Sequence, residues 1–350
     1  MSGAATTPAP DGPAPRTAGG WRQFTVEGDR EAQDSALALL AAVASDFAVL
    51  RDRAGLRVFC RPTAAAMVTA AGQPFHTAPA EVAALPVPDE DLPVTGPAAS
   101  GLIEEFLTAS GPLVASLAAD VRNGSLTRTD AGFDIMVAHL VAVARYLPRD
   151  DSAMGTLVRR HHPIPLSFPS VSAHADGMIA LSGGGAALRA QLRKQYSAAA
   201  PVVERRVRSL LAQLQDGGPA AFDHAQRWHD LVDGHRRKVQ DALERGELWA
   251  VTEDGEVLPD PGIGALHALT AAVPALRDYL ATNVGYLSMR FMMGLLYLSL
   301  HAGIGLGMSE RMVLCNAIGR SMEAVGRRGV SELMTGLISA ISADAAAVAR

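Results

Sequence analysis

The stretch YLSMRFMMGLLYLSLHAGIGLGMSER, from Tyr286 to Arg311, decides the fold of this chain. Between Arg290 and Glu310 it has no charged residue if histidine is counted as neutral. Its length and continuous apolar character predict a buried helix, and the glycines at positions 303, 305 and 307 predict the turn that ends it. A membrane span is not expected, because a histidine and several glycines interrupt the run.

Polar side chains interrupt this helix on one face. On a helix Tyr286, Arg290, Tyr297 and His301 stand at offsets of 0, 4, 11 and 15, which places them on a common side. Arginine and histidine are rarely buried without partners. The stripe therefore predicts either the wall of a cleft or a polar network inside the core.

The remaining sequence predicts a single helix-rich α+β domain. Residues 1–20 predict a disordered tail, residues 21–350 the domain, and the proline-rich residues 73–97 an irregular loop. Strand patterns occur at Trp21–Val26 and Leu56–Pro62, and a hairpin pattern at Trp249–Leu258. Helical patterns occur at Asp34–Phe47, Ala98–Ala119, Asp134–Tyr146, Ala186–Leu214 with a break near Pro201, Gln226–Leu248, Ile263–Leu280, Asn283–Leu300, Ser309–Arg327 and Val330–Val348. The segment HHPIPLSFPSVSAH, residues 161–174, predicts an extended loop because of its three prolines.

Composition excludes several classes of function. The net charge of −5 gives no general attraction to nucleic acid or to an anionic membrane. The two cysteines, Cys60 and Cys315, exclude a disulfide framework and a cysteine-rich zinc site, and they fit a reducing cytoplasm. His224, His229 and His235 are spaced by five and six residues, on different helical faces, so no metal site is expected.

Three segments resemble a known family. The run LSLHAGIGLGMSERM, Leu298–Met312, is similar to the closing signature of the glutamate-elimination domain of lantibiotic dehydratases, and His301 falls on the functional histidine of that domain. The segment LSFPSVSAHADGMI, Leu166–Ile179, resembles a second signature, and WRQFTV opens the chain as members do. The resemblance implies a small, mostly antiparallel sheet beside the helices, and a ribosomally made peptide with dehydrated serines as substrate.

One departure favours a particular branch of this family. The elimination enzymes carry a histidine and two arginines in alternation on a strand, whereas this chain has Gly55, Arg57 and Phe59. Phenylalanine cannot hold a carboxylate as arginine does, although Arg61 on the same strand face offers partial compensation. Glutamate elimination is therefore disfavoured, and the chain looks more like the pyridine synthases of thiopeptide biosynthesis.

That resemblance implies a formal 4+2 aza-cycloaddition of two dehydroalanines, followed by loss of water and of the leader peptide. The catalytic residues expected are Tyr286, Ser288, Tyr297 and His301. The substrate-binding residues expected are Arg57, Glu104, Arg290, Ser299, Arg311 and His174. No metal or cofactor is expected, and the partners expected are the precursor peptide with its leader and other enzymes of the pathway. A glutamate-elimination enzyme and a non-catalytic scaffold that binds the precursor remain alternatives.

Overall fold

The structure, a computed structural model, describes residues 20–52, 55–72, 74–75, 79–86, 94–148, 150–218, 220–250 and 264–348. Its strands are β1 (Trp21–Val26), β2 (Phe47–Asp52), β3 (Gly55–Cys60), β4 (Ala80–Val82), β5 (Val94–Thr95) and β6 (Trp249–Ala250). Its helices are α1 (Arg30–Val43), α2 (Pro62–Ala70), α3 (Ala99–Arg122), α4 (Arg128–Val143), the short 3-10 helix η1 (Ala144–Tyr146), α5 (Ala153–His161), α6 (Pro169–Leu181), α7 (Gly185–Asp216), α8 (Asp223–Glu244), α9 (Ala265–Ala272), α10 (Pro274–Thr282), α11 (Val284–Ile304), α12 (Met308–Gly326) and α13 (Val330–Val348). The predicted helix-rich α+β class with a small antiparallel sheet is confirmed.

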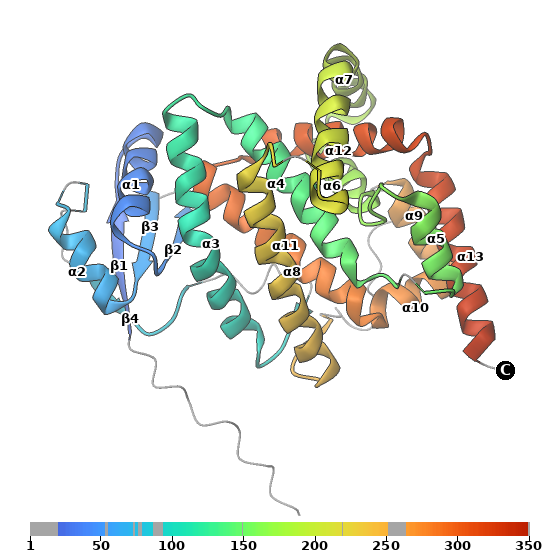
Figure 1. The fold of residues 1–350 in the computed structure, drawn as a ribbon, viewed down its shortest axis with the longest axis horizontal. Helices are drawn as coiled ribbons and strands as arrows, with labels where there is room; N and C mark the ends of the chain where they lie inside the picture. Colours follow the sequence, from blue (N-terminus) through green and yellow to red (C-terminus); the bar gives the residue numbers. More distant parts are fainter. Residues whose placement is uncertain are drawn as a thin grey trace, which may run out of the picture.

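A four-stranded antiparallel sheet, in the order β2-β3-β1-β4, stands at one end of the molecule (Figure 1). Because side chains alternate along a strand, its two faces have different neighbours. Leu56 and Val58 of β3 pack on α1 and α2. Arg57 and Phe59 point the other way, and Phe59 joins the core of the helical body. Strand β2 contacts both α3 and α11, which connects the sheet directly to the central helix.

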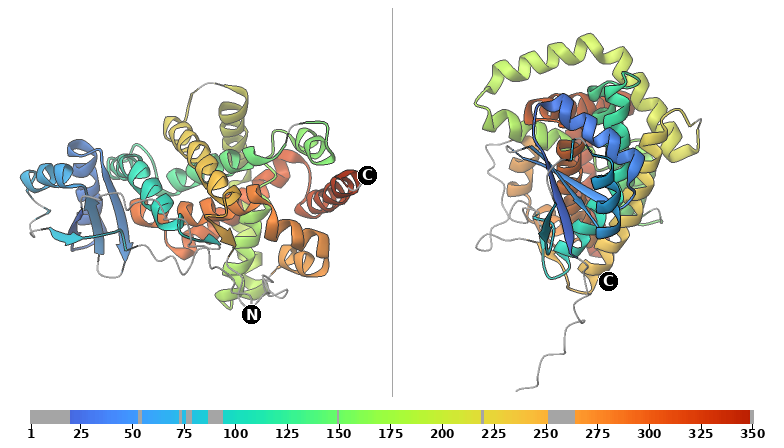
Figure 2. Two further views of the ribbon diagram at one scale, coloured as in Figure 1. Left: turned by 90° about the horizontal axis from the view of Figure 1, so that it is seen from below. Right: turned by 90° about the vertical axis from the view of Figure 1, so that its left-hand side faces the viewer.

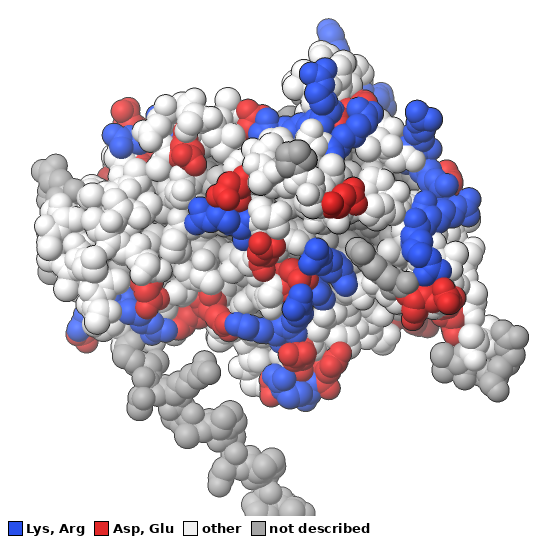
Figure 3. All heavy atoms as spheres, in the orientation of Figure 1, with Lys and Arg blue, Asp and Glu red and all other residues white. Residues whose placement is uncertain are grey.

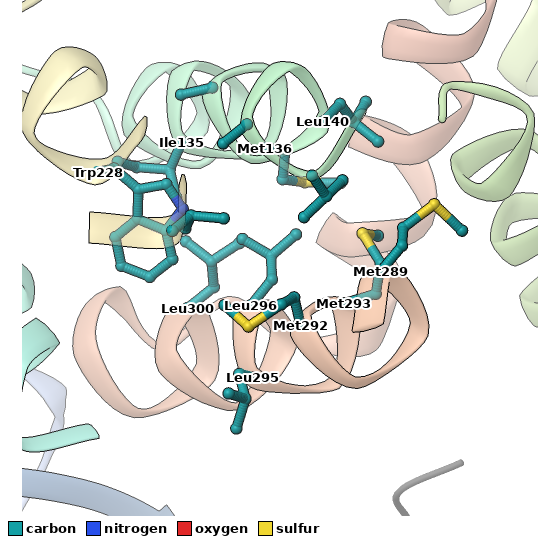
Figure 4. Close-up of a cluster of buried hydrophobic side chains, with 14 of the residues drawn as sticks. Ile135, Met136, Leu140, Trp228, Met289, Met292, Met293, Leu295, Leu296 and Leu300 are labelled. Atoms are coloured by element: carbon teal, nitrogen blue, oxygen red, sulfur yellow. The ribbon is translucent and has the colours of Figure 1, made fainter. Parts of the chain in front are cut away.

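Helix α11 is the centre of the helical body. It contacts α3, α4 and α8 as well as β2, and most of its side chains are buried. Figure 4 shows Leu296 and Leu300 pointing toward Ile135 of α4 and Trp228 of α8. Burying each such side chain contributes about 2 kcal/mol to the free energy of folding, so the apolar run of the sequence accounts for the position of α11.

Both ends of α11 have local causes. The side chain of Asn283 accepts a hydrogen bond from the Tyr286 backbone N–H, which caps the start of the helix. Gly305 ends it with φ of 60°, in the left-handed region that favours glycine. Gly307 then caps α12, which begins at Met308, and the Gly307 N–H donates to the carboxylate of Glu310. The turn predicted from the glycines is confirmed.

Two predictions that rested on prolines are wrong. The extended loop predicted at residues 161–174 ends early, because α6 begins at Pro169. Proline is favoured at the first position of a helix, where its missing N–H has no partner to lose. Helix α7 also continues through Pro201, which is exposed, so the carbonyl that loses its partner can bind water. This long helix projects from the body (Figures 1 and 2).

Three other element boundaries differ from prediction. Helix α1 starts at Arg30, capped by Asp29, and the strand β2 follows where the predicted helix was to end at Phe47. The predicted helix at 263–280 is two helices, α9 and α10, separated at Val273 before Pro274. Most of the predicted hairpin at 249–258 lies outside the described residues, as do residues 1–19 of the predicted tail.

Two helices, α3 and α11, are long and apolar enough to cross a membrane by length and composition. In the most apolar window of each, 61% and 72% of the residues are buried inside the protein. Core helices of soluble proteins have the same character, and both helices here serve as core.

Candidate functional site

The polar stripe of α11 lies at the edge of the helical body. Tyr286, Arg290, Tyr297 and His301 are all partly exposed, whereas the residues flanking them on the helix are mostly buried. We call these four residues the α11 polar face. Of the two predicted arrangements, a wall that reaches solvent therefore describes the stripe better than a closed network in the core.

Helix α6 brings a histidine onto this face. The Nδ1 atom of His174 lies 2.5 Å from the hydroxyl of Tyr297, and the two rings meet edge to face with centroids 5.2 Å apart. The Tyr297 hydroxyl also lies 3.5 Å from the Sγ atom of Cys315 on α12. Three helices thus join in one hydrogen-bonded chain, Cys315–Tyr297–His174.

All three groups of this chain are neutral near pH 7. Burial, together with the charges of His267, Arg311 and Arg290, lowers the pKa of His174 to about 4. Burial raises the pKa of Tyr297 well above its usual value and that of Cys315 to about 12. Two proton orders satisfy the chain: Cys315 to Tyr297 to His174, or the reverse. The free Nε2 atom of His174 therefore carries a proton in one order and a lone pair in the other.

Positive charge surrounds this neutral chain. Arg290 and Arg311 both act on His174 electrostatically, and the guanidinium carbon of Arg311 lies 5.2 Å from the centre of the Tyr297 ring. Among the described residues no carboxylate forms an ion pair with either arginine, and the buried Nε of Arg311 has no hydrogen-bond partner. The site therefore offers hydrogen-bond donors to carbonyl oxygens or to an oxygen that gains negative charge.

The two tyrosines of the polar face have different surroundings. Burial raises the pKa of Tyr286, while the charge of Arg290 opposes the shift. Tyr286 lies near Tyr146 and Tyr279, whose pKa values burial also raises. Its hydroxyl is therefore a neutral donor and acceptor at physiological pH.

Two serines expected in the site are in the core instead. Ser288 is fully buried, and its hydroxyl donates to the Gly285 carbonyl at a distance of 3.0 Å, inside the helix. Ser299 is 2% exposed, and its hydroxyl has no partner among the described residues. Neither serine belongs to the α11 polar face, because their offsets from Tyr286 of 2 and 13 rotate them toward neighbouring helices.

His301 stands at the other end of the polar face. Its Nδ1 atom lies 3.3 Å from the Leu306 carbonyl oxygen. Two arginines, one at the start of α1 and one in β2, donate hydrogen bonds to backbone carbonyls at the same end of α11. Arg30 donates to the Ile304 carbonyl at 2.6 Å, and Arg51 donates to the Ala302 carbonyl at 3.3 Å. Their charges favour a helix C-terminus. The sequence offered no signal for these contacts, since the partners are more than 250 residues apart.

Among the residues expected to bind substrate near the sheet, Glu104 forms an ion pair with Arg61. Arg61 contacts Glu104 at 2.6 Å and lies over the ring of Trp21 at 3.9 Å. Phe59 is fully buried. Arg57 lies in β3 between Thr25 and Leu50 of the adjacent strands. Position 59 is thus part of the core, and Arg61 is already engaged with a carboxylate.

The densest group of histidines has structural partners. His224 lies 2.8 Å from the buried Asp134, and His235 packs edge to face on Phe106. Among the described residues no three His, Cys, Asp or Glu side chains are placed to hold a metal ion together.

The fold as a whole is similar to that of solved structures, among them TsrL and TbtD. TsrL is 18% identical to the chain, with a TM-score of 0.68, and the match covers 90% of this chain and 98% of TsrL. TbtD, the pyridine synthase from thiomuracin biosynthesis, is 19% identical with a TM-score of 0.57, and the match covers 88% of this chain and 99% of TbtD. No model of a protein family matches the chain, and no curated protein matches it.

Proposed function

We propose that this protein is a macrocycle-forming pyridine synthase, which joins two dehydroalanines of a linear, azole-containing precursor peptide. The fold shared with TbtD supports the class of enzyme. The observation that carries the proposal is the neutral chain Cys315–Tyr297–His174 beside Arg290 and Arg311, two cations for which the described part of the chain provides no carboxylate partner.

The proposed reaction needs no oxidant. One dehydroalanine and the preceding amide, as its imidic acid tautomer, form the four-atom azadiene, and the alkene of the second dehydroalanine adds across it. Two carbon–carbon bonds form. The former amide oxygen then leaves as water, and the nitrogen of the second dehydroalanine leaves with the leader as an amide. Loss of these two molecules gives the aromatic pyridine.

The α11 polar face and the residues of α6 and α12 beside it suit the first step. An imidic acid forms when the amide nitrogen loses a proton and the amide oxygen gains one. The Nε2 atom of His174 can take the proton from the amide nitrogen and return it to the amide oxygen, so the imidazole is neutral before and after the transfer, while Tyr297 holds Nδ1 in place. Arg290 and Arg311 hold the amide oxygen, and Tyr286 positions the peptide beside them.

The later steps and the peptide path use the rest of the site. His301 transfers protons during loss of water and of the leader. Arg57, on the side of β3 that faces the helical body, contacts the peptide. Ser288 receives no role, since its hydroxyl is buried and bonded within the helix.

Glutamate elimination is the competing activity in the same superfamily. A clamp for the glutamate carboxylate needs two cations on β3, but β3 carries one arginine, Arg57, because the buried Phe59 stands where the second would be, and Arg61 after the strand is paired with Glu104. Purified protein should therefore be given two substrates in parallel, the dehydrated azole-bearing precursor and a glutamylated precursor. Mass spectrometry should show a leader amide and a macrocycle from the first. Release of glutamate from the second, with the first unchanged, would overturn the proposal.

A further inference from the structure

A second group of charged side chains lies where η1 meets α8, and none of them belongs to the α11 polar face. A cavity of about 240 Å³ is lined by Arg145 of η1 and by Asp233, Arg236 and Arg237 of α8. Figure 3 shows acidic and basic side chains mixed over this part of the molecule. Three guanidinium groups meet one carboxylate in this cavity, so its lining carries two net positive charges.

The single carboxylate cannot satisfy the three arginines. Arg236 contacts the Oδ1 atom of Asp233 at 2.9 Å, Arg145 lies 3.4 Å from Oδ2, and Arg237 also contacts Oδ2. Burial alone would raise the pKa of Asp233, but the hydrogen bonds and charges of Arg236 and Arg237 outweigh burial and lower it. Asp233 is therefore ionised, and both of its carboxylate oxygens already contact arginines.

Hydrogen-bond donors remain unused around the cavity. A guanidinium has five N–H donors, and Arg145 and Arg237 each make one contact to Asp233 through a single nitrogen. Arg236 is 5% exposed, and its buried Nε has no hydrogen-bond partner among the described residues. The donors of Arg145 and Arg237 are on partly exposed side chains, so an anion in the cavity can accept hydrogen bonds from them.

We propose that Arg145, Arg236 and Arg237 form a binding site for an oxyanion, a carboxylate or a phosphate. Planar guanidinium groups bind both anions through paired hydrogen bonds. The cavity holds such a group together with several waters. The site does not depend on the proposed cycloaddition, since none of its residues belongs to α6, α11 or α12.

Isothermal titration calorimetry on the full chain tests the site with two probes, inorganic phosphate and the tetrapeptide acetyl-Ala-Glu-Leu-Ala-amide. The variants are Arg145→Gln and Arg237→Gln, whose side chains are 41% and 65% exposed and so can be replaced without opening the core. The matched control is Arg227→Gln, an exposed arginine of α8 that pairs with Asp223 outside the cavity. Circular dichroism checks that each variant is folded.

Saturable binding of either probe, weakened about tenfold by Arg145→Gln or Arg237→Gln and unchanged by Arg227→Gln, supports the site. If the two probes compete and the peptide binds more tightly, the ligand of the site is the carboxylate of an acidic side chain. Binding of phosphate alone identifies a small anion. No binding of either probe at tens of millimolar, or equal loss in the Arg227 variant, overturns the proposal.

Discussion

Replacing Tyr297 by phenylalanine removes the hydroxyl that connects Cys315 to His174 and changes little else. The Nδ1 atom of His174 then loses its partner at 2.5 Å. An unsatisfied buried group costs about 1–3 kcal/mol, so the free energy of unfolding should fall by about that amount. Activity should fall further. A positioned acid–base group contributes about 10²–10⁴-fold, and this loss should appear mainly in kcat.

The assay is the initial rate of macrocycle formation from the dehydrated precursor, followed by mass spectrometry, with the melting temperature measured in parallel. The control is Tyr196→Phe, because the Tyr196 hydroxyl lies 3.1 Å from Glu204 on α7 and also interacts with Ser321 on α12, and neither partner has a role in the proposed reaction. This variant should keep full activity. If Tyr297→Phe keeps more than about half of the wild-type rate while remaining folded, the proposed proton chain has no catalytic role, and a non-catalytic scaffold becomes the better explanation.

Three further predictions concern stability. Burial lowers the pKa of three histidines, to about 3 for His139 and about 4 for His174 and His235. The unfolded chain therefore binds protons first as pH falls below about 6.5, and urea denaturation should show each histidine removing about 1.4 kcal/mol of stability per pH unit. Asp134→Asn should cost about 3 kcal/mol in the same assay, because it removes the buried carboxylate shared by Arg206 and His224 and leaves Arg206 with the more exposed Asp130 alone. Gly303→Ala should lower the melting temperature, since its Cβ would lie 1.6 Å from Val114, whereas Gly101→Ala, with open space around it, should raise it.

The central helix and its polar face are the part of the structure that the sequence predicts well. Spacing along one helix is a local property, so Tyr286, Arg290, Tyr297 and His301 follow from the 3.6-residue period alone. The same period also places Ser288 away from this face. Ser288 was expected to be catalytic for its hydroxyl, and that hydroxyl is bonded to the Gly285 carbonyl inside the helix.

The partners of the polar face come from distant parts of the chain. His174 is 123 residues from Tyr297, and no spacing rule connects them. The family signature selected His174 as a substrate contact, but its bond to Tyr297 depends on how α6 packs near α11. No sequence pattern predicted that His267 would lie near His174, because His267 is in a short alanine-rich helix.

Two of the wrong predictions share a physical cause. Proline was taken to end helices, yet Pro169 starts α6 and Pro201 lies within α7. Proline has no N–H, so a proline inside a helix leaves one backbone carbonyl without its helical hydrogen bond. The helix can continue where that carbonyl is exposed to water, and nothing is lost where the proline is in the first turn. The strand β2 was missed because Phe47–Asp52 follows an alanine-rich helix without a strong turn signal.

The most direct test of the proposed reaction follows the fate of one oxygen atom. The precursor is made with a heavy oxygen isotope in the amide carbonyl that precedes the first dehydroalanine, and the product is weighed by mass spectrometry after incubation with the protein. Cycloaddition through the imidic acid predicts that the label leaves as water, so the macrocycle contains none of it. A macrocycle that retains the label, or a precursor that is returned unchanged, would contradict the account.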